Sequence, residues 1–155
     1  MNRLPLGTAL VMVVVLGTFL LNRASLQARD TIRKHHLEDI EQALYFARSL
    51  QGTYPPYDAP SWCGRLQDPG SHAVRAQIEA ALRAQNEKYA NPAKPFPTDP
   101  RGSDYFYWKR SPAMFELYAT LETDPTGERS VAACPAAGGK ATYDYGLTSV
   151  WRESS

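Results

Sequence analysis

"LPLGTALVMVVVLGTFLL", residues 4–21, decides the fold, because this run contains no charged side chain and no strongly polar one. As a helix it spans about 27 Å, close to the hydrocarbon thickness of a bilayer. Such a segment is either a cleaved secretory signal or a retained membrane anchor. Cleavage after Ala24, Ser25 or Ala28 would each place an unsuitable residue at the −3 site of a signal peptidase. We therefore favour a retained anchor, formed by residues 1–23.

The following stretch, "SLQARDTIRKHHLEDIEQALYFARSL" (25–50), has the periodicity of an amphipathic helix. Its apolar residues recur at spacings of three and four, with Ile32 near the start and then Leu37, Ile40, Leu44, Ala47 and Leu50. Gly52 and the pair Pro55–Pro56 predict its end. Only two glycines, Gly7 and Gly17, interrupt residues 6–50 as helix breakers. The sequence therefore predicts one continuous helix about 65 Å long, half membrane anchor and half amphipathic.

The middle of the chain combines a loop with a second helix. Residues 53–70 are rich in proline and aromatic residues, which predicts an ordered loop rather than a flexible linker. Asp68 followed by Pro69 is typical of a helix start. The helix is expected to run to about Tyr89, with one apolar face made of Val74, Ile78, Ala81, Leu82 and Tyr89.

Three strands are expected after it. In "FPTDPRGSDYFYW" (96–108) the residues at 99–102 predict a tight turn, and 105–108 a first strand. "MFELYATLE" (114–122) alternates as a second strand, with Phe115, Leu117, Ala119 and Leu121 on one face. "TYDYGLTSVW" (142–151) predicts a third, whose shared face is Tyr143, Tyr145, Leu147 and Trp151. A three-stranded antiparallel sheet laid across the long helix gives an α+β head, residues 24–155.

The charges of the head balance. Residues 24–155 carry 15 Lys and Arg against 16 Asp and Glu, so no basic field attracts nucleic acid or anionic lipid, and we expect no nucleic-acid partner. Basic residues are more frequent after the apolar segment than before it. Counted literally, this would leave the head in the cytoplasm, but the interleaved acids from Asp30 onward weaken the count.

Two cysteines, Cys63 and Cys134, are present. An even number behind an export-type segment permits one disulfide. Closing a loop of about 70 residues would stabilise the fold by about 4 kcal/mol on the chain-entropy model. The alternative is two buried free thiols in a cytoplasmic domain.

Three segments together resemble the type IV pilin-like proteins, and most of all the major pseudopilin of type II secretion systems. They are "RDTIRKHHLEDIEQALYFARSLQGTYP" (29–55), the turn and strand at 96–108, and "ELYATLETD" (116–124). The resemblance implies a single-pass inner-membrane protein with a periplasmic or extracellular head. This overrules the charge count and permits the Cys63–Cys134 bond.

The resemblance also implies filament assembly with like subunits or other pilin-family subunits through the N-terminal helix. The residues expected to pack in the membrane or filament core are Leu10, Val14, Leu16, Gly17, Leu20 and Leu21. The family's processing site is altered: Thr8 follows Gly7 where the family has a phenylalanine-like residue, and Met12 takes the place of its fifth-position glutamate. Because that carboxylate pairs with a neighbour's amino terminus in hydrocarbon, the chain is expected to be an atypical or permanently anchored member, unless its start lies elsewhere.

Major pseudopilins often hold calcium in the loop after the second strand. Here that loop offers Glu122, Asp124 and Glu128 as oxygen ligands. Calcium needs six to eight oxygens, so backbone carbonyls would supply the others. The same acids, beside proline and glycine, also suit turn caps, and no other cofactor is expected.

No motif for catalysis is found: the chain lacks a P-loop, a dinucleotide fingerprint, zinc spacing and a nucleophile elbow. His35 and His36 are neighbours on a helix and point about 100° apart, so they cannot ligate one metal from one face. With His72 they are expected to be solvated. We expect a non-enzymatic structural or accessory subunit of a type II secretion pseudopilus or a type IV pilus-like filament. The alternative is a membrane-tethered extracytoplasmic binding module that does not polymerise.

Overall fold

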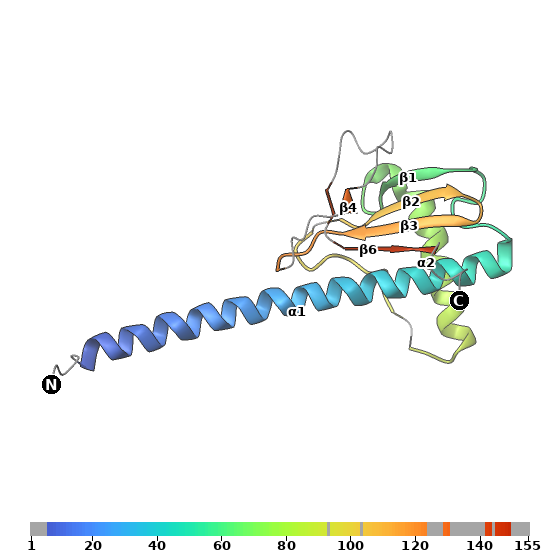
Figure 1. Cartoon of the computed structure of the whole chain (residues 1–155). Coiled ribbons are helices and arrows are strands. Elements are labelled where there is room, and N and C mark those ends of the chain that lie inside the picture. The colour runs from blue at the N-terminus through green and yellow to red at the C-terminus, as the bar shows by residue number, and fades with distance from the viewer. Residues whose placement is uncertain are drawn as a thin grey trace.

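The computed structural model describes residues 6–92, 94–102, 104–123, 129–130, 142–143 and 145–149, with the side chains of 6–10, 129–130 and 142 left out. Figure 1 shows a long helix that carries a compact head on its C-terminal half. In chain order the elements are α1 (Leu6–Gln51), β1 (Trp62–Arg65), η1 (Pro69–Ser71), α2 (His72–Lys88), β2 (Phe106–Ser111), β3 (Met114–Ala119), β4 (Arg129–Ser130), β5 (Thr142–Tyr143) and β6 (Tyr145–Thr148).

The predicted continuous helix is confirmed. α1 runs unbroken for 46 residues, about 69 Å at 1.5 Å per residue. It ends where the glycine predicted, because Gly52 adopts φ +74° and its N–H donates to the Arg48 carbonyl at 2.8 Å. Only glycine takes this left-handed conformation without steric cost.

The buried stripe of α1 is shorter than predicted. Leu37, Ile40 and Leu44 are fully buried, as expected, and Ala47 is also in the core. Leu50 is 62% exposed and Ile32 42% exposed, so the prediction was wrong at both ends of the stripe. Sequence periodicity continues past the region that the sheet covers, and only the covered part of the stripe is buried.

The sheet has four strands rather than the predicted three. Its order is β1-β2-β3-β6, and every neighbouring pair is antiparallel. The additional strand, β1, lies in the segment predicted to be a loop. It was missed because its four residues show no alternation between buried and exposed positions and stand among prolines and glycines. The α+β class is therefore confirmed, with a larger sheet.

The aromatic run before and within β2 serves two cores. Tyr105 and Tyr107 are fully buried in the core against α1, which also takes Phe115 and Leu117 of β3. Phe106, on the other face, is buried in a second cluster with Tyr143. This alternation confirms the strand prediction for both segments.

The predicted third strand is divided between two sheets. β6 pairs with β3, and its Tyr145 and Leu147 pack against the main core. Tyr143 lies in β5, which pairs with β4, and packs on the opposite side of the main sheet. The shared face predicted for 142–151 was therefore wrong for Tyr143, and Trp151 lies outside the described residues.

The second helix follows a short 3₁₀ turn. Asp68 stands at the N-cap of η1 with Pro69 after it, as predicted, and makes no side-chain cap hydrogen bond. α2 ends at Lys88, close to the predicted end. Its predicted face is confirmed for Val74, Ile78, Ala81 and Leu82. Tyr89, at the C-cap, is 60% exposed and does not belong to that face.

The two ends of the sheet face opposite ends of α1. At one end, Tyr54 lies just beyond the C-terminal end of α1, and its N–H donates to the carbonyl of Pro112 in the turn between β2 and β3. At the other end of β3, the backbone of Glu122 and Thr123 donates to the Asp30 carboxylate. The end of the sheet that carries the start of β2 therefore points along α1 toward its N-terminal half (Figure 1).

Candidate functional site

The N-terminal half of α1 is an exposed apolar rod. From Val11 to Leu21 its large apolar side chains are 57% to 73% exposed. Fully exposing such side chains costs about 1.5–3 kcal/mol each relative to burial. A contiguous apolar surface of this kind marks a membrane or protein contact. It is the one helix in the described part of the chain that is long and apolar enough to cross a bilayer.

The residues expected to pack in a membrane or filament core lie on this rod. Val14, Leu16, Leu20 and Leu21 are exposed, and open space surrounds the position that a Cβ of Gly17 would take. The side chain of Leu10 is not described. The rod therefore presents the expected residues to whatever surrounds it.

A cluster of charged groups marks the place where α1 enters the head. Arg33 of α1 is 1% exposed and reaches three acids from three segments. Its Nε lies 2.5 Å from Asp99 Oδ2, its Nη1 2.8 Å from Asp30 Oδ1, and its Nη2 2.8 Å from Glu122 Oε1. These contacts join the helix to the turn before β2 and to the segment after β3. We call Arg29, Asp30, Arg33, Asp99, Arg101 and Glu122 the junction cluster.

Each acid of the junction cluster has further donors. The Asp30 carboxylate accepts hydrogen bonds from the backbone N–H groups of Glu122 and Thr123, at 2.9 and 2.8 Å, and from the Thr123 hydroxyl at 2.6 Å. Glu122 receives both Nε and Nη2 of Arg29, each at 2.8 Å. Charge-assisted, two-pronged bonds of this kind fix geometry as well as supplying energy.

The cluster favours the ionised form of two of its acids, Glu122 and Asp30. Hydrogen bonds from Arg29 and Arg33 hold the pKa of Glu122 at about 2, against burial, which acts to raise it. For Asp30, burial would raise the pKa, but the hydrogen bonds from Thr123, Glu122 and Arg33 outweigh it and the pKa is lowered. Glu122 and Asp30 are therefore charged and paired with arginine at neutral pH, which suits a rigid joint between rod and head.

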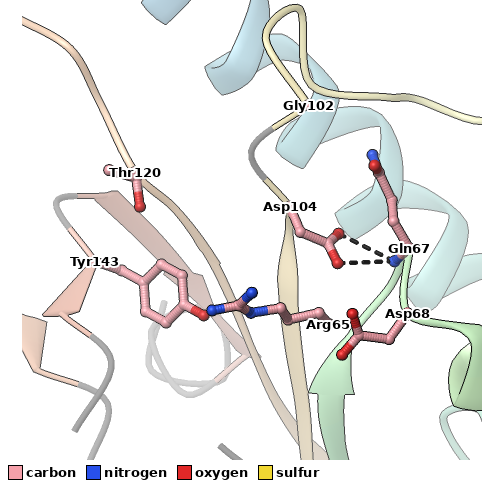
Figure 2. Close-up of a pocket in the computed structure, with 7 residues that line it drawn as sticks. All are labelled: Arg65, Gln67, Asp68, Gly102, Asp104, Thr120 and Tyr143. Atoms are coloured by element: carbon pink, nitrogen blue, oxygen red, sulfur yellow. Dashed lines mark hydrogen bonds between the residues drawn. The ribbon is translucent and has the colours of Figure 1, made fainter.

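A polar pocket of about 410 Å³ opens at the same end of the sheet. Figure 2 shows its lining: Arg65, Gln67, Asp68, Gly102, Asp104, Thr120 and Tyr143. The Gln67 backbone N–H donates to the Asp104 carboxylate, and the Gln67 nitrogen lies 3.0 Å from each carboxylate oxygen. The Arg65 guanidinium lies beside the Tyr143 hydroxyl. The pocket thus combines two carboxylates with one guanidinium and two hydroxyls.

Burial shapes the pocket's electrostatics. Burial raises the pKa of Asp104, and the nearby charge of Asp68 adds to this, although hydrogen bonds from the Gln67 and Tyr105 backbone oppose it. Burial likewise raises the pKa of Tyr143, so its phenol keeps its proton at neutral pH. The arrangement can bind polar groups, and a cation in particular would offset the two neighbouring acids.

The expected calcium ligands are not seen together. Glu122 is paired with Arg29 and Arg33 and lies 3.4 Å from Arg101. Asp124 and Glu128 lie outside the described residues. Within the described ranges no group of three metal-binding side chains is present. The calcium site therefore remains a prediction, and Glu122 already has three basic partners.

The predicted disulfide also stays a prediction. Cys63 lies in β1, partly buried beside the second core cluster. Cys134 lies outside the described residues, so the pairing of the two is not placed here.

The histidines differ from one another. His35 is exposed, with Nδ1 3.1 Å from Glu38, and His72 is exposed at the start of α2. His36 is only partly solvated: its Nδ1 lies 2.7 Å from the Tyr105 hydroxyl, and burial lowers its pKa. The expectation of solvated histidines was wrong for His36.

Sequence reasoning missed the junction cluster and the pocket. No local pattern singles out Arg33, because its partners Asp99 and Glu122 stand 66 and 89 positions away in the sequence. The Asp99–Gly102 turn was predicted, and the Asp99 carbonyl does accept the Gly102 N–H at 3.1 Å. A turn prediction does not indicate where the Asp99 carboxylate points, and in the structure it contacts Arg33 of α1.

Comparison of the chain with protein-family models, curated proteins and solved structures finds no match.

Proposed function

We propose that the chain is a non-enzymatic structural or accessory subunit of a pilus-like or type II secretion pseudopilus-like filament. It is anchored in the inner membrane by residues 4–21, with the α+β head in the periplasm or outside the cell. The observation that supports this best is α1 itself: one unbroken helix, exposed and apolar over Val11–Leu21, whose apolar face is buried in the head from Leu37 to Ala47.

The physical reason is that the two halves need different surroundings. The C-terminal half already has its apolar partner, the sheet. The N-terminal half has an exposed apolar surface, which either lipid or the same helix of neighbouring subunits would cover. Because the helix continues without a break from one environment into the other, it fixes the position of the head relative to the segment that contacts the membrane.

The test is site-specific photo-crosslinking in intact cells, with a photoreactive amino acid placed at Leu16 or Leu20. We expect ladders of multimers from these positions, because like helices pack side by side. The control places the same photoreactive residue at Arg83, which is exposed on α2 of the head. If crosslinks at Leu16 give only lipid adducts and monomer, the filament part of the proposal is wrong.

Intact mass of the membrane-bound protein tests the form of the anchor. A species that begins at Thr8 indicates processing, and one that begins at Met1 a permanent anchor. A species that begins near Arg29 would mean a released head and would contradict the proposed anchor.

A second candidate is a membrane-tethered binding module. The polar pocket at the end of the sheet favours it, because a purely structural head has no need of one. Multimer ladders in the crosslinking experiment would count against this candidate as the whole function.

A further inference from the structure

The polar pocket at the end of the sheet has two sides of opposite charge. Figure 2 shows Asp68 and Asp104 on one side of it. The Arg65 guanidinium lies on the other side, beside the Tyr143 hydroxyl, with Thr120 on the adjoining wall. The cavity, of about 410 Å³, has room for a small molecule. A ligand that satisfies both sides therefore carries a positive group and a negative group close together.

The acidic side of the pocket can accept an ammonium group. The Asp104 carboxylate is held by the Gln67 backbone N–H and, with about four lone-pair sites, has capacity for further donors. Asp68 is exposed and makes no side-chain cap hydrogen bond at η1. Burial, and then the nearby charge of Asp68, raise the pKa of Asp104. A cation between the two carboxylates would therefore stabilise the charged form of both.

The opposite side can accept a carboxylate. Arg65 is exposed, and its guanidinium has several N–H donors, one of which the Tyr143 hydroxyl accepts. Because burial raises the pKa of Tyr143, its hydroxyl keeps a proton that it can donate to another group. The exposed Thr120 adds a second hydroxyl to this wall. A guanidinium with hydroxyl donors beside it suits a carboxylate, which a guanidinium binds through two parallel hydrogen bonds.

We propose that this pocket binds a free α-amino acid. The ammonium group of the ligand would donate to Asp68 and Asp104, and its carboxylate would accept from Arg65 and from the hydroxyls of Tyr143 and Thr120. An α-amino acid carries both charged groups on one carbon atom, which gives the short separation that the pocket requires. This inference names the ligand class of the binding-module candidate given under the proposed function, and it depends on neither the membrane anchor nor filament assembly.

Ligands with a single charged group are expected to bind less well. An amine without a carboxylate would pair with the two acids but leave the donors of Arg65 unused. A carboxylate without an amine would pair with Arg65 but add a third negative charge beside Asp68 and Asp104, which costs free energy. Blocking either charged group of an amino acid should therefore remove most of its affinity.

The test is isothermal titration calorimetry of the full chain in detergent with L-alanine, N-acetyl-L-alanine and L-alaninamide. The methyl side chain adds no polar group, so the three compounds report on the two charged sides alone. The blocked compounds also represent the C-terminus and the N-terminus of a peptide. We expect L-alanine to bind, and each blocked compound to bind at least about tenfold more weakly, because each loses charge-assisted hydrogen bonds. Absence of L-alanine binding, or equal binding of either blocked compound, would overturn the proposal.

Two pairs of variants test the location of the site. Asp68→Asn and Arg65→Gln should each reduce the affinity for L-alanine about tenfold. Glu87→Gln and Arg83→Gln remove the same charges at exposed residues of α2 and should leave the affinity unchanged. All four side chains are exposed, so the melting temperatures should stay close to that of the parent chain, which separates lost binding from lost folding. Equal affinities of Asp68→Asn and Glu87→Gln would place the ligand elsewhere and overturn the assignment.

This proposal and the proposed filament subunit can fail separately. Photo-crosslinking at Leu16 tests assembly through the rod and does not involve the pocket. Multimer ladders without L-alanine binding would overturn the pocket assignment alone. Binding of L-alanine with the expected loss in Asp68→Asn would support the pocket whatever the crosslinks show.

Discussion

The Nε of Arg33 lies 2.5 Å from Asp99 Oδ2, with both side chains 1% exposed and 66 positions apart in the chain. A buried guanidinium must be paired, because taking an ion out of water costs several kcal/mol. Here the pairing brings the turn before β2 onto the long helix at the level where the rod leaves the head. The junction cluster is thus a fixed joint made of side chains.

Replacing Arg33 with Met removes the cation but retains most of the side chain's volume. Asp30 and Asp99 would then be buried without the guanidinium that neutralises their charge, so the free energy of unfolding should fall by about 3–5 kcal/mol. Denaturant unfolding of the full chain in detergent, followed by near-UV absorbance of the head's aromatic residues, measures this. Arg83→Met, an exposed residue paired with Glu79 at 2.6 Å, should cost less than about 1 kcal/mol. Similar losses from the two variants would mean that the joint adds nothing to stability.

Acid should weaken the head in a defined range of pH. Glu122 has a folded pKa of about 2 against an ordinary value of 4.5. Since the folded value is the lower one, its stabilisation is complete above pH 4.5 and is lost as the pH falls toward 2. Asp30, whose pKa is also lowered, acts in the same direction. Denaturant midpoints measured between pH 6 and pH 2 should fall most steeply there, and less steeply in Glu122→Gln. A slope unchanged by that variant would contradict the assignment.

The Tyr118 ring lies so close to Gly146 of β6 that it leaves no room for a side chain at that position. A Cβ there would meet Cδ1 of Tyr118 at 2.7 Å, closer than side chains approach. The Tyr118 ring cannot easily move, because it is also stacked on the Tyr143 ring, with the two ring centroids 5.6 Å apart. Gly146→Ala should therefore lower the melting temperature, with a loss of about 1–3 kcal/mol from overpacking. Gly70→Ala is the control, since no atom lies within 4 Å of its added Cβ; equal shifts would show that the ring can yield.

A charge in the rod should weaken anchoring. Val14 lies near the middle of the apolar segment, where an arginine costs about 2.5–3.5 kcal/mol on the insertion scale. Val14→Arg should therefore move a large part of the protein from the membrane pellet to the alkaline-carbonate supernatant. Gln27→Arg, an exposed position between rod and head, should remain in the pellet. Full retention of Val14→Arg would contradict a membrane-spanning rod.

Local patterns account for much of the fold. Each confirmed pattern depends only on residues of one helix or strand. The helical spacing places Leu37, Ile40 and Leu44 in the core, and the strand alternation does the same for Phe115 and Leu117. The strand β1 is too short to show a period.

The candidate sites depend on contacts between distant residues, and no local pattern encodes those. The neighbours of Arg33 are brought to it by the way the sheet lies on α1. In the same way, the pocket unites Arg65, Asp104 and Tyr143 only because β1, the start of β2 and β5 end near one another. The exposed apolar rod could be predicted, since its composition alone sets it apart.

The unbroken course of α1 also makes the molecule a lever. From Leu21 to Gln51 the helix extends about 45 Å, and a change of 20° in the tilt of its membrane half would swing the far end of the head sideways by about 15 Å. If residues 4–21 span the membrane as proposed, bilayer thickness, which is one of the factors that set the tilt of a spanning helix, would thereby change where the outermost part of the head points.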